Sequence, residues 1–533
     1  MIINLKDIKL NDKNFCKEFN AFINKLECKE NTTIVFENKD YHFFADNCIE
    51  EVIYMTNTCG ENEMKIPTKK IGIMLKNLCN LTLDGNGAKL LYNGRMTEFV
   101  LQNCKNVIIK NFVIDFETPT VAEFEVVNKK LLYFDIKPNA EAGCSTKCGH
   151  LNFACKLPKS NFVIQENDLH GTTKRMILNS YVLTNPLFCA MAKPLKNGLV
   201  RIYMPSKGFK TGCIYQFCSV LRDGTGTFLD NCNNIELQNN TYHFMHGMGI
   251  LAQLTKDITI SNCNFVPNKK RTSVAFADLI HCSMCYGKIS VTNCNFNGSR
   301  DDIINVHGNH FKVTAINNNV ATVKFMHPQT YGFLGFFAGD TVDFINQDTL
   351  VPMHTNTVKS AKMLDKYQTE IVFENAIPAL DASLVLENAS KTASLFVDNI
   401  VGENIPTRGI LVTTRQPVII QNSKFIKTFM SAILVSDDAK SWYESGFATD
   451  VTIQNNEFID CKETIINILP EAHTLTDKPT VHKNIKVLNN KFVTNHSQIA
   501  NVVRTDGFIF ENNTIISSKP PKFNVVDSKN VQI

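Results

Sequence analysis

Apolar and polar residues alternate with a period of two in many short segments, and most of these segments carry an Asn shortly before a closing aromatic residue. Such alternation is typical of β-strands that bury one face. Where copies are adjacent they recur every ~20–35 residues, a spacing typical of a solenoid. The segments are NLTLDGNG (80–87), NVIIKNFVIDF (106–116), NNIELQNNTYHF (233–244), DITISNCNF (257–265), KISVTNCNF (288–296), PVIIQNSKF (417–425), DVTIQNNEF (450–458), NIKVLNNKF (484–492) and GFIFENNTI (507–515).

These repeats predict an all-β fold, a right-handed parallel β-helix. No long stretch with a period of 3.6 residues accompanies them, which argues against a solenoid of helices. Asn at a fixed bend favours a left-handed backbone and can form hydrogen-bonded ladders between coils. A β-sandwich is the alternative. Its strands would pair through Asn-Gly or Asp-Gly hairpins, which these copies lack.

Two regions, 117–222 and 308–392, lose the repeated pattern. They contain hairpin-like strands such as KKLLYFDIKP, NGLVRIYMP, HFKVTAINNNVATVKFM and GDTVDFI. We expect each region to form a small antiparallel β-barrel or sheet inserted between coils. Modules of this kind can wall a cleft on the side of a solenoid.

The N-terminal segment, residues 3–27, is interpreted as an amphipathic helix that caps the exposed apolar end of the first coil. The predicted organisation is an N-terminal cap with the first coils (1–75), β-helix (76–116), a first inserted barrel (117–222), β-helix carrying acidic residues (223–307), a second inserted barrel (308–392) and C-terminal coils (393–533).

Charge and hydropathy exclude several classes of function. The formal net charge is only +4 and no basic stripe is present, which argues against a nucleic-acid partner. No apolar run reaches the ~18–20 residues needed to span a bilayer. The N-terminus lacks the basic and apolar regions of a signal peptide. Localisation therefore stays open, with the cytoplasm slightly favoured over export, and oligomeric state is not predicted.

The chain contains 18 cysteines at irregular spacings. A disulfide framework fits such spacing poorly, and Cys263 and Cys294 occupy equivalent places in two copies of the repeat. We expect most thiols to be free and buried inside the coils. Cys282 and Cys285 resemble half of a zinc site, but no second Cys-x-x-Cys answers them. No metal site and no cofactor are predicted.

Acidic and histidine side chains gather between Ala277 and Gly308 around one copy of the repeat. A single Asp pair is usually a turn, but a group at equivalent points of successive coils would be stacked ~4.7–4.9 Å apart. Hydrolysis of a glycosidic bond needs one carboxyl as an acid and another as a base or nucleophile, and adjacent carboxylates can split their pKa values. The group comprises Asp278, His281, Asp301, Asp302 and His307, and Arg300 adjoins it. Because neighbouring strand residues point to opposite faces, we expect only one of Asp301 and Asp302 to face the cleft.

The only Trp of the chain, Trp442, lies in the polar segment ILVSDDAKSWYESG, residues 433–446. A lone Trp is most often a core residue, but an aromatic ring in a loop also suits stacking against a sugar. In that case Asp437 and Glu444 would accept hydrogen bonds from sugar hydroxyls.

Two further segments offer candidate substrate-binding residues. Arg408 and Arg415 have planar heads that could hold hydroxyls or orient the carboxylates, or could pair with surface acids. His246 lies one coil before the acids, near Gly247 and Gly249, which permit a close backbone approach.

Taken in order, these segments resemble glycoside hydrolase family 110, the α-1,3-galactosidases. The resemblance covers residues ~75–520 and rests on GMGILAQ with KDITI, AD followed by His281, RDDIINVHG, the Gly-Asp pair at 339–340, PTRGILVTTRQPV, SDD with WYESG, and KP with VHKNI. The resemblance implies a β-helix with two β-barrel insertions. It also implies metal-free hydrolysis of terminal α-1,3-linked galactose with inversion, on blood-group-B-like or linear α-galactosyl ends.

In this family Asp278, Asp301 and Asp302 fall on positions that carry or support catalysis. The chain departs from the family pattern at Leu334, where an acidic residue is expected. We therefore expect an exo-acting α-galactosidase whose proton donor is not assigned. A polygalacturonase-like hydrolase and a non-catalytic glycan-binding β-helix are the alternatives. The first should carry more cations around the acids, and the second would bind without turnover.

Overall fold

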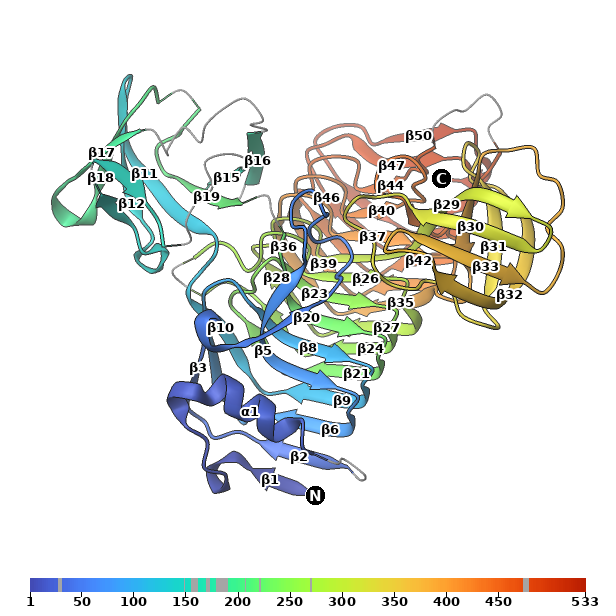
Figure 1. Cartoon of the computed structure of the whole chain (residues 1–533). Helices are drawn as coiled ribbons and strands as arrows, with labels where there is room; N and C mark the ends of the chain where they lie inside the picture. The colour runs from blue at the N-terminus through green and yellow to red at the C-terminus, as the bar shows by residue number, and fades with distance from the viewer. Residues whose placement is uncertain are drawn as a thin grey trace.

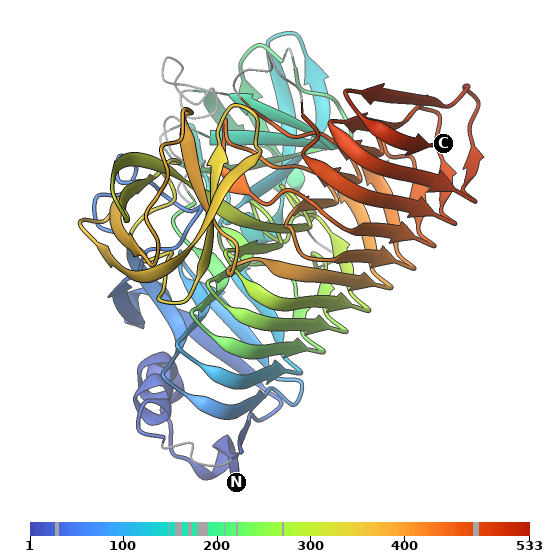
Figure 2. The ribbon, with the colours of Figure 1, turned by 90° about the vertical axis from the view of Figure 1, so that its right-hand side faces the viewer.

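The computed structural model describes residues 1–26, 31–147, 149–154, 162–168, 173–178, 190–206, 208–219, 222–268, 271–472 and 479–533. Its main body is a stack of coils that climbs from the N-terminus to the C-terminus (Figures 1 and 2). Corresponding strands of successive coils pair in parallel, and the matched family model is that of a right-handed β-helix. The predicted fold class is confirmed.

The coils present three faces of stacked strands. The first face consists of β1 (Ile2–Asn4), β2 (Thr32–Val35), β6 (Cys79–Asp84), β9 (Lys105–Lys110), β21 (Asn233–Gln238), β24 (Lys256–Ser261), β27 (Tyr286–Thr292), β35 (Ala393–Asp398), β38 (Val418–Gln421), β42 (Val451–Gln454), β45 (His482–Leu488), β48 (Thr505–Glu511) and β51 (Lys529–Gln532). The second consists of β3 (Asp40–Phe44), β7 (Lys89–Asn93), β10 (Val113–Thr118), β22 (Thr241–Tyr242), β25 (Asn264–Phe265), β28 (Asn295–Asn297), β36 (Val401–Ile405), β39 (Lys424–Thr428), β43 (Glu457–Ile459), β46 (Lys491–Val493) and β49 (Thr514–Ile516).

The third face is the one that carries the polar cluster. It consists of β5 (Thr68–Lys76), β8 (Thr97–Gln102), β20 (Thr225–Asp230), β23 (Met248–Gln253), β26 (Ile280–Ser283), the first half of β29 (Ile304–Asn317), β37 (Ile410–Thr413), β40 (Ile433–Val435), β44 (Ile466–Ile468), β47 (Gln498–Val503) and β50 (Lys522–Val526). An additional strand, β4 (Ile49–Val52), pairs antiparallel with β5.

The repeated Asn and aromatic residues stabilise the stack in two ways. Asn80, Asn106 and Asn234 all have positive φ, and their side chains form a ladder in which each amide donates to the Asn of the preceding coil, at 2.8 and 3.1 Å. The closing aromatics stack inside the coils, as Phe265 does on Phe296 with ring centroids 4.9 Å apart. The left-handed bends and ladders predicted from the Asn pattern are confirmed.

The predicted N-terminal helix is wrong over much of its length. Only α1 (Phe15–Ile23) is an α-helix, and the first residues instead form β1, which pairs in parallel with β2. Short 3₁₀ turns at Leu5–Asp7 and Asp12–Asn14 separate the strand from the helix. Phe15, Phe19 and Ile23 are buried on the core of the first coils, so this face of α1 covers their apolar end.

The first insertion is a mainly antiparallel sheet that projects to the left of the coils in Figure 1. Its strands are β11 (Ala122–Lys130), β12 (Tyr133–Pro138), β13 (Ser145–Lys147), β14 (His150–Asn152), β15 (Phe162–Asp168), β16 (Thr173–Leu178), β17 (Met191–Pro194), β18 (Val200–Tyr203) and β19 (Cys213–Ser219). A separate apolar core, including Phe124, Phe134 and Tyr215, fills it.

The second insertion is a closed antiparallel barrel on the opposite side in Figure 1. It is formed by the second half of β29 with β30 (Val320–Phe325), β31 (Thr341–Asn346), β32 (Pro352–Met363), β33 (Gln368–Phe373) and β34 (Leu384–Asn388). Strand β29 continues from the β-helix into the barrel without a break. A short strand, β41 (Glu444–Ser445), pairs with β29 at Gly308 and Asn309, between the two halves.

Cys263, Cys294, Cys282 and Cys285 are free thiols buried in the coil interior, as the sequence predicts. Within the described ranges, no helix is long and apolar enough to cross a membrane.

Candidate active site

The parallel register of the third face stacks the candidate polar residues on successive coils. Ile280, Ile304 and Ile410 are paired residues at the starts of β26, β29 and β37. Asp278, Asp302 and Arg408 each lie two residues before one of these positions. The predicted stacking is therefore present, because one carboxylate oxygen from each of Asp278, Asp301 and Asp302 lies within 4.8 Å of the others.

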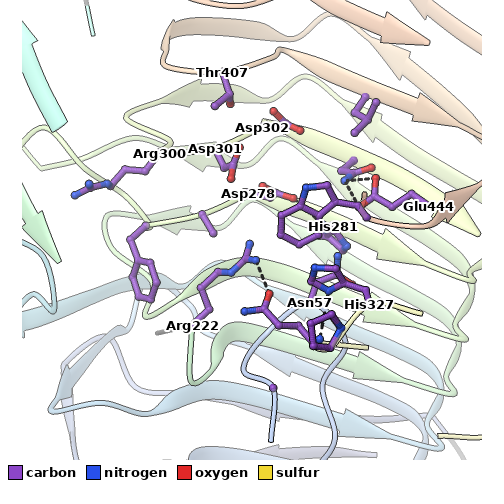
Figure 3. A pocket seen from close by; sticks show the side chains of 18 of the residues that line it. Asn57, Arg222, Asp278, His281, Arg300, Asp301, Asp302, His327, Thr407 and Glu444 are labelled. Atoms are coloured by element: carbon purple, nitrogen blue, oxygen red, sulfur yellow. Dashed lines mark hydrogen bonds and ion pairs between the residues drawn. The ribbon is translucent and has the colours of Figure 1, made fainter. Parts of the chain in front are cut away.

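This aspartate trio, Asp278, Asp301 and Asp302, lines one side of a cavity of about 750 Å³ (Figure 3). The expectation that only one of Asp301 and Asp302 faces the cleft is wrong. Both precede the first residue of β29, so the alternation of side chains along a strand does not apply to them. Their neighbour Arg300 also lines the cavity, but Figure 3 shows its side chain extending away from the trio.

Asp302 is the most deeply buried carboxylate of the trio, with 1% of its side chain exposed. The Arg408 guanidinium donates from Nε to Oδ1 at 2.9 Å, and its Nη2 lies 2.8 Å from Oδ2. Burial raises the pKa of Asp302 to about 7, against the opposing charge of Arg408. The group is thus poised to exchange a proton near neutral pH.

Asp278 contacts His281, which in turn contacts a second buried histidine, His307. Oδ2 of Asp278 lies 2.7 Å from Nδ1 of His281, and Nε2 of His281 lies 2.8 Å from Nε2 of His307. Burial, with a contribution from the charge of Asp301, raises the pKa of Asp278 to about 8. Burial, together with His307, lowers the pKa of His281 to about 3. His281 lines the cavity, whereas His307 lies behind it.

Glu444 enters the same cavity from β41. The side chain of Asn305 donates to both of its carboxylate oxygens at 3.3 Å, and Nε2 of His307 lies 3.6 Å from Oε1. Among the residues that the structure describes, two groups have donor atoms close enough to share a cation: His281 with His307 and Glu444, and the aspartate trio.

Trp442, His327 and Arg222 form an aromatic wall of the cavity. Trp442 is 42% exposed and stacks on His327, with ring centroids 4.4 Å apart. The Arg222 guanidinium lies 5.4 Å from the centre of the Trp442 ring and donates to Gln329 at 2.9 Å. Because Trp442 lines the cavity, it is not a core residue. The wall is built from three separate parts of the chain.

Arg415 does not line the cavity. It binds Asp343 of β31 at 2.6 Å and Glu387 of β34 at 2.9 Å. These contacts fasten the barrel to the coil that follows β37. Arg415 therefore pairs with acidic residues, which was the alternative to a role in substrate binding. The acids are buried, whereas the alternative placed them on the surface.

Asp437 is likewise outside the cavity and fully buried, where His310 Nε2 lies 2.8 Å from its Oδ1. The opposite charge of Asp437 raises the pKa of His310, although burial acts against it. This pair fixes the start of the loop that carries Trp442 and Glu444.

His246 lies between Thr120 and Asp223, which flank the first insertion, at 2.9 and 2.8 Å from its two ring nitrogens. It connects the entry and the exit of that insertion rather than reaching the cavity.

Leu334 lies in the barrel and is not among the residues that line the cavity. Six carboxylates already line the cavity, namely the trio with Glu444, Glu61 and Glu63, so an acid at position 334 is not needed to supply a proton donor. The cavity residues that sequence reasoning missed include Asn57, Arg222 and His327. Each belongs to a non-repeated segment, and no motif places it near the acids.

Comparisons with known proteins agree with this architecture. Residues 321–380 match a family model described as GLAA-B beta-barrel domain II, and residues 385–515 match the right handed beta helix region. An alpha-1,3-galactosidase A of Bacteroides thetaiotaomicron is 32% identical over 92% of this chain and 87% of its own length.

Two further relatives carry related names. An alpha-1,3-galactosidase A of Akkermansia muciniphila is 32% identical over 87% of this chain and 79% of its own length. An alpha-1,3-galactosidase B of Bacteroides thetaiotaomicron is 30% identical over 92% of this chain and 82% of its own length.

Proposed function

Since the chain belongs to glycoside hydrolase family 110, the α-1,3-galactosidases, we propose that it removes terminal α-1,3-linked galactose from glycans, including blood-group-B-like or linear α-galactosyl ends. The observation that carries this proposal is the aspartate trio in a walled cavity. The trio occupies one side, and the wall of Trp442 and His327 occupies another. Exo action enters the proposal from the family resemblance and not from the shape of the cavity.

We assign roles within the trio by burial. Asp278 and Asp302, with 7% and 1% of their side chains exposed, hold and deprotonate the attacking water. Asp301 is 19% exposed and is assigned to protonate the leaving oxygen, because the leaving glycan must depart toward solvent. Glu444 and Asn305 offer hydrogen bonds to sugar hydroxyls from the end of the cavity near β41.

Inversion of the anomeric centre rests on the family resemblance and not on the carboxylate spacing. The nearest oxygens of the trio lie within 4.8 Å, whereas carboxyl groups in inverting enzymes are typically ~6.5–9.5 Å apart. A water and a sugar must therefore be accommodated around the trio rather than between two distant acids.

A screen of galactosyl disaccharides tests this function. We expect release of galactose from an α-1,3-linked disaccharide, with little release from α-1,4 or α-1,6 linkages. Proton NMR of the first product should show β-galactose, which then mutarotates. Initial α-galactose would contradict inversion, and binding without turnover would contradict the proposal as a whole.

Polygalacturonide chains serve as the control substrate in this screen. Two of the three arginines that line the cavity are poorly placed for a uronate carboxylate, because Arg408 is ion-paired with Asp302 and the side chain of Arg300 extends away from the trio. Only Arg222, which gives one of its N–H groups to Gln329, is left for such a carboxylate. We therefore expect no galacturonate release.

Trp442→Ala is expected to raise KM for the galactosyl substrate about tenfold with a smaller change in kcat. Stacking on an aromatic ring contributes about 0.5–1.5 kcal/mol, and the upper end of this range corresponds to a tenfold change in affinity. Steady-state kinetics measure the effect. Trp442→Phe keeps a ring beside His327 and should retain most of the affinity. An unchanged KM in the alanine variant would show that the ring does not contact the sugar.

A further inference from the structure

The hydrogen bonds of the buried pair His281 and His307, next to Asp278, determine which of their atoms carry protons. His281 and Asn305 are paired in register on β26 and β29, and His307 lies two residues beyond Asn305. Both histidines therefore project from the same outer face of the sheet. Their Nε2 atoms are 2.8 Å apart, and each exposes 3% or less of its surface.

The tautomers of both histidines follow from the hydrogen bond that His307 makes with the backbone of Gly308. Nδ1 of His307 lies 2.6 Å from the carbonyl oxygen of Gly308, and a carbonyl oxygen can only accept. His307 therefore carries a proton on Nδ1. In a neutral ring its Nε2 is then an acceptor, because one nitrogen donates and the other accepts.

The same reasoning extends to Asp278. Two lone pairs cannot face each other at 2.8 Å, so His281 must donate from Nε2 to His307. Nδ1 of His281 is then an acceptor, and Oδ2 of Asp278, at 2.7 Å, must bear the hydrogen. The elevated pKa of Asp278 and the depressed pKa of His281 agree with this arrangement.

We propose that the His281–His307 pair is a positioning element that holds a proton on Asp278, leaving Asp302, paired with Arg408, as the ionised carboxylate that deprotonates water. The O–H of Asp278 is directed to His281, so its other oxygen is free to accept a hydrogen bond from the water. Asp302 takes the proton as the water oxygen bonds to the anomeric carbon, and the leaving oxygen receives a proton from Asp301. This inference rests on the proposed function only for the catalytic consequence.

The charged surroundings favour a single negative charge at this point. Ionised Asp278 would place a second carboxylate beside Asp302, and like charges raise each other's pKa. The titratable and charged groups that face Asp278 and the histidine pair from neighbouring elements are Arg222, Asp301, Arg408 and Glu444. Of these, Asp301 is neutral in the productive form, because it holds the proton for the leaving oxygen.

Nitrogen-15 NMR of the free wild-type protein tests the proton positions without any substrate. We expect a neutral His281 protonated on Nε2 and a neutral His307 protonated on Nδ1, with signals assigned by their loss in His281→Gln and His307→Gln. A His281 protonated on Nδ1, or a doubly protonated His307, would overturn the proposal. A transition metal bound at one equivalent in protein as purified would also overturn it, because an ion would then replace the shared proton. This result is independent of whether the galactosidase activity is found.

The pH profile of kcat/KM provides the catalytic test. His307→Leu removes the acceptor for Nε2 of His281. His281 can then carry its proton on Nδ1 instead and donate it to an ionised Asp278. The new charge raises the pKa of Asp302, and a base with a raised pKa stays protonated to higher pH. The acidic limb should therefore move about one unit upward.

Combining His307→Leu with Asp278→Asn should return the limb to its wild-type position, because a neutral amide removes the added charge. The control is His482→Gln, a change at a fully buried histidine whose Nδ1 accepts from Ala448, which should not move the limb. A purely structural role for the histidines predicts lower activity in His307→Leu with an unmoved limb. That outcome, or a limb that the double variant fails to restore, would reject the positioning role.

Discussion

Asp302→Asn is expected to lower kcat on an α-1,3-linked galactosyl substrate by about 10³-fold, within the range for loss of a general acid or base. The asparagine keeps the size of the side chain, and its oxygen can still accept from Nε of Arg408, which lies 2.9 Å from Oδ1. The substitution therefore removes the basic carboxylate without changing the volume of the side chain, and the amide nitrogen takes the place of Oδ2, which lies 2.8 Å from Nη2 of Arg408. Measurement of kcat at saturating substrate gives the effect.

Asp506→Asn is the matched control for this experiment. Asp506 lies on β48, where it pairs with Lys529 at 3.1 Å and does not line the cavity. We expect wild-type kcat from this variant. Near wild-type kcat from Asp302→Asn would exclude Asp302 as the base and with it the assignment of roles within the trio.

Phe458→Ala is expected to lower the free energy of unfolding by about 3–5 kcal/mol, the usual cost of deleting a buried phenyl ring. Phe458 is fully buried and stacks between Phe425 and Phe492, with ring centroids 5.4 and 4.9 Å away. In a stack of coils each coil contacts mainly its two neighbours, so the void left by the Phe458 ring weakens the contacts with both neighbouring coils. Denaturant titration followed by circular dichroism measures the change.

Ile419→Ala is the corresponding control. Ile419 lies on β38 of the same stack but is 37% exposed, so its removal should cost less than about 1 kcal/mol. Equal effects from the two variants would mean that the aromatic stack adds nothing to the stability of the coils.

The sequence predicts the coil architecture well because the same physical constraint recurs in every coil. Asn106 and Phe265 occupy positions that only a left-handed bend and a stacked interior explain, and both are found there. The parallel register also follows from the repeats. For this reason, the repeats predict that Asp278 and Asp302 lie close together although they are separated along the chain.

The walls of the cavity were not predictable by this route. Arg222 and His327 belong to an insertion junction and to the barrel, and their positions depend on loop paths that no repeat constrains. Arg415 and Asp437 fall in motifs that also contain cavity residues, yet each is held by buried partners outside the cavity. Motif membership places a residue on the correct coil, but packing decides which way its side chain points.

Strand β29 restricts movement of the barrel relative to the β-helix. Its first half is paired between β26 and β37, and its second half belongs to the barrel, with no linker between them. His327, which follows β30 in that barrel, is thus joined to the acids through a continuous strand rather than a hinge. We expect the galactosyl end to enter a preformed cavity, with turnover unaffected by solvent viscosity except through diffusion of substrate and product.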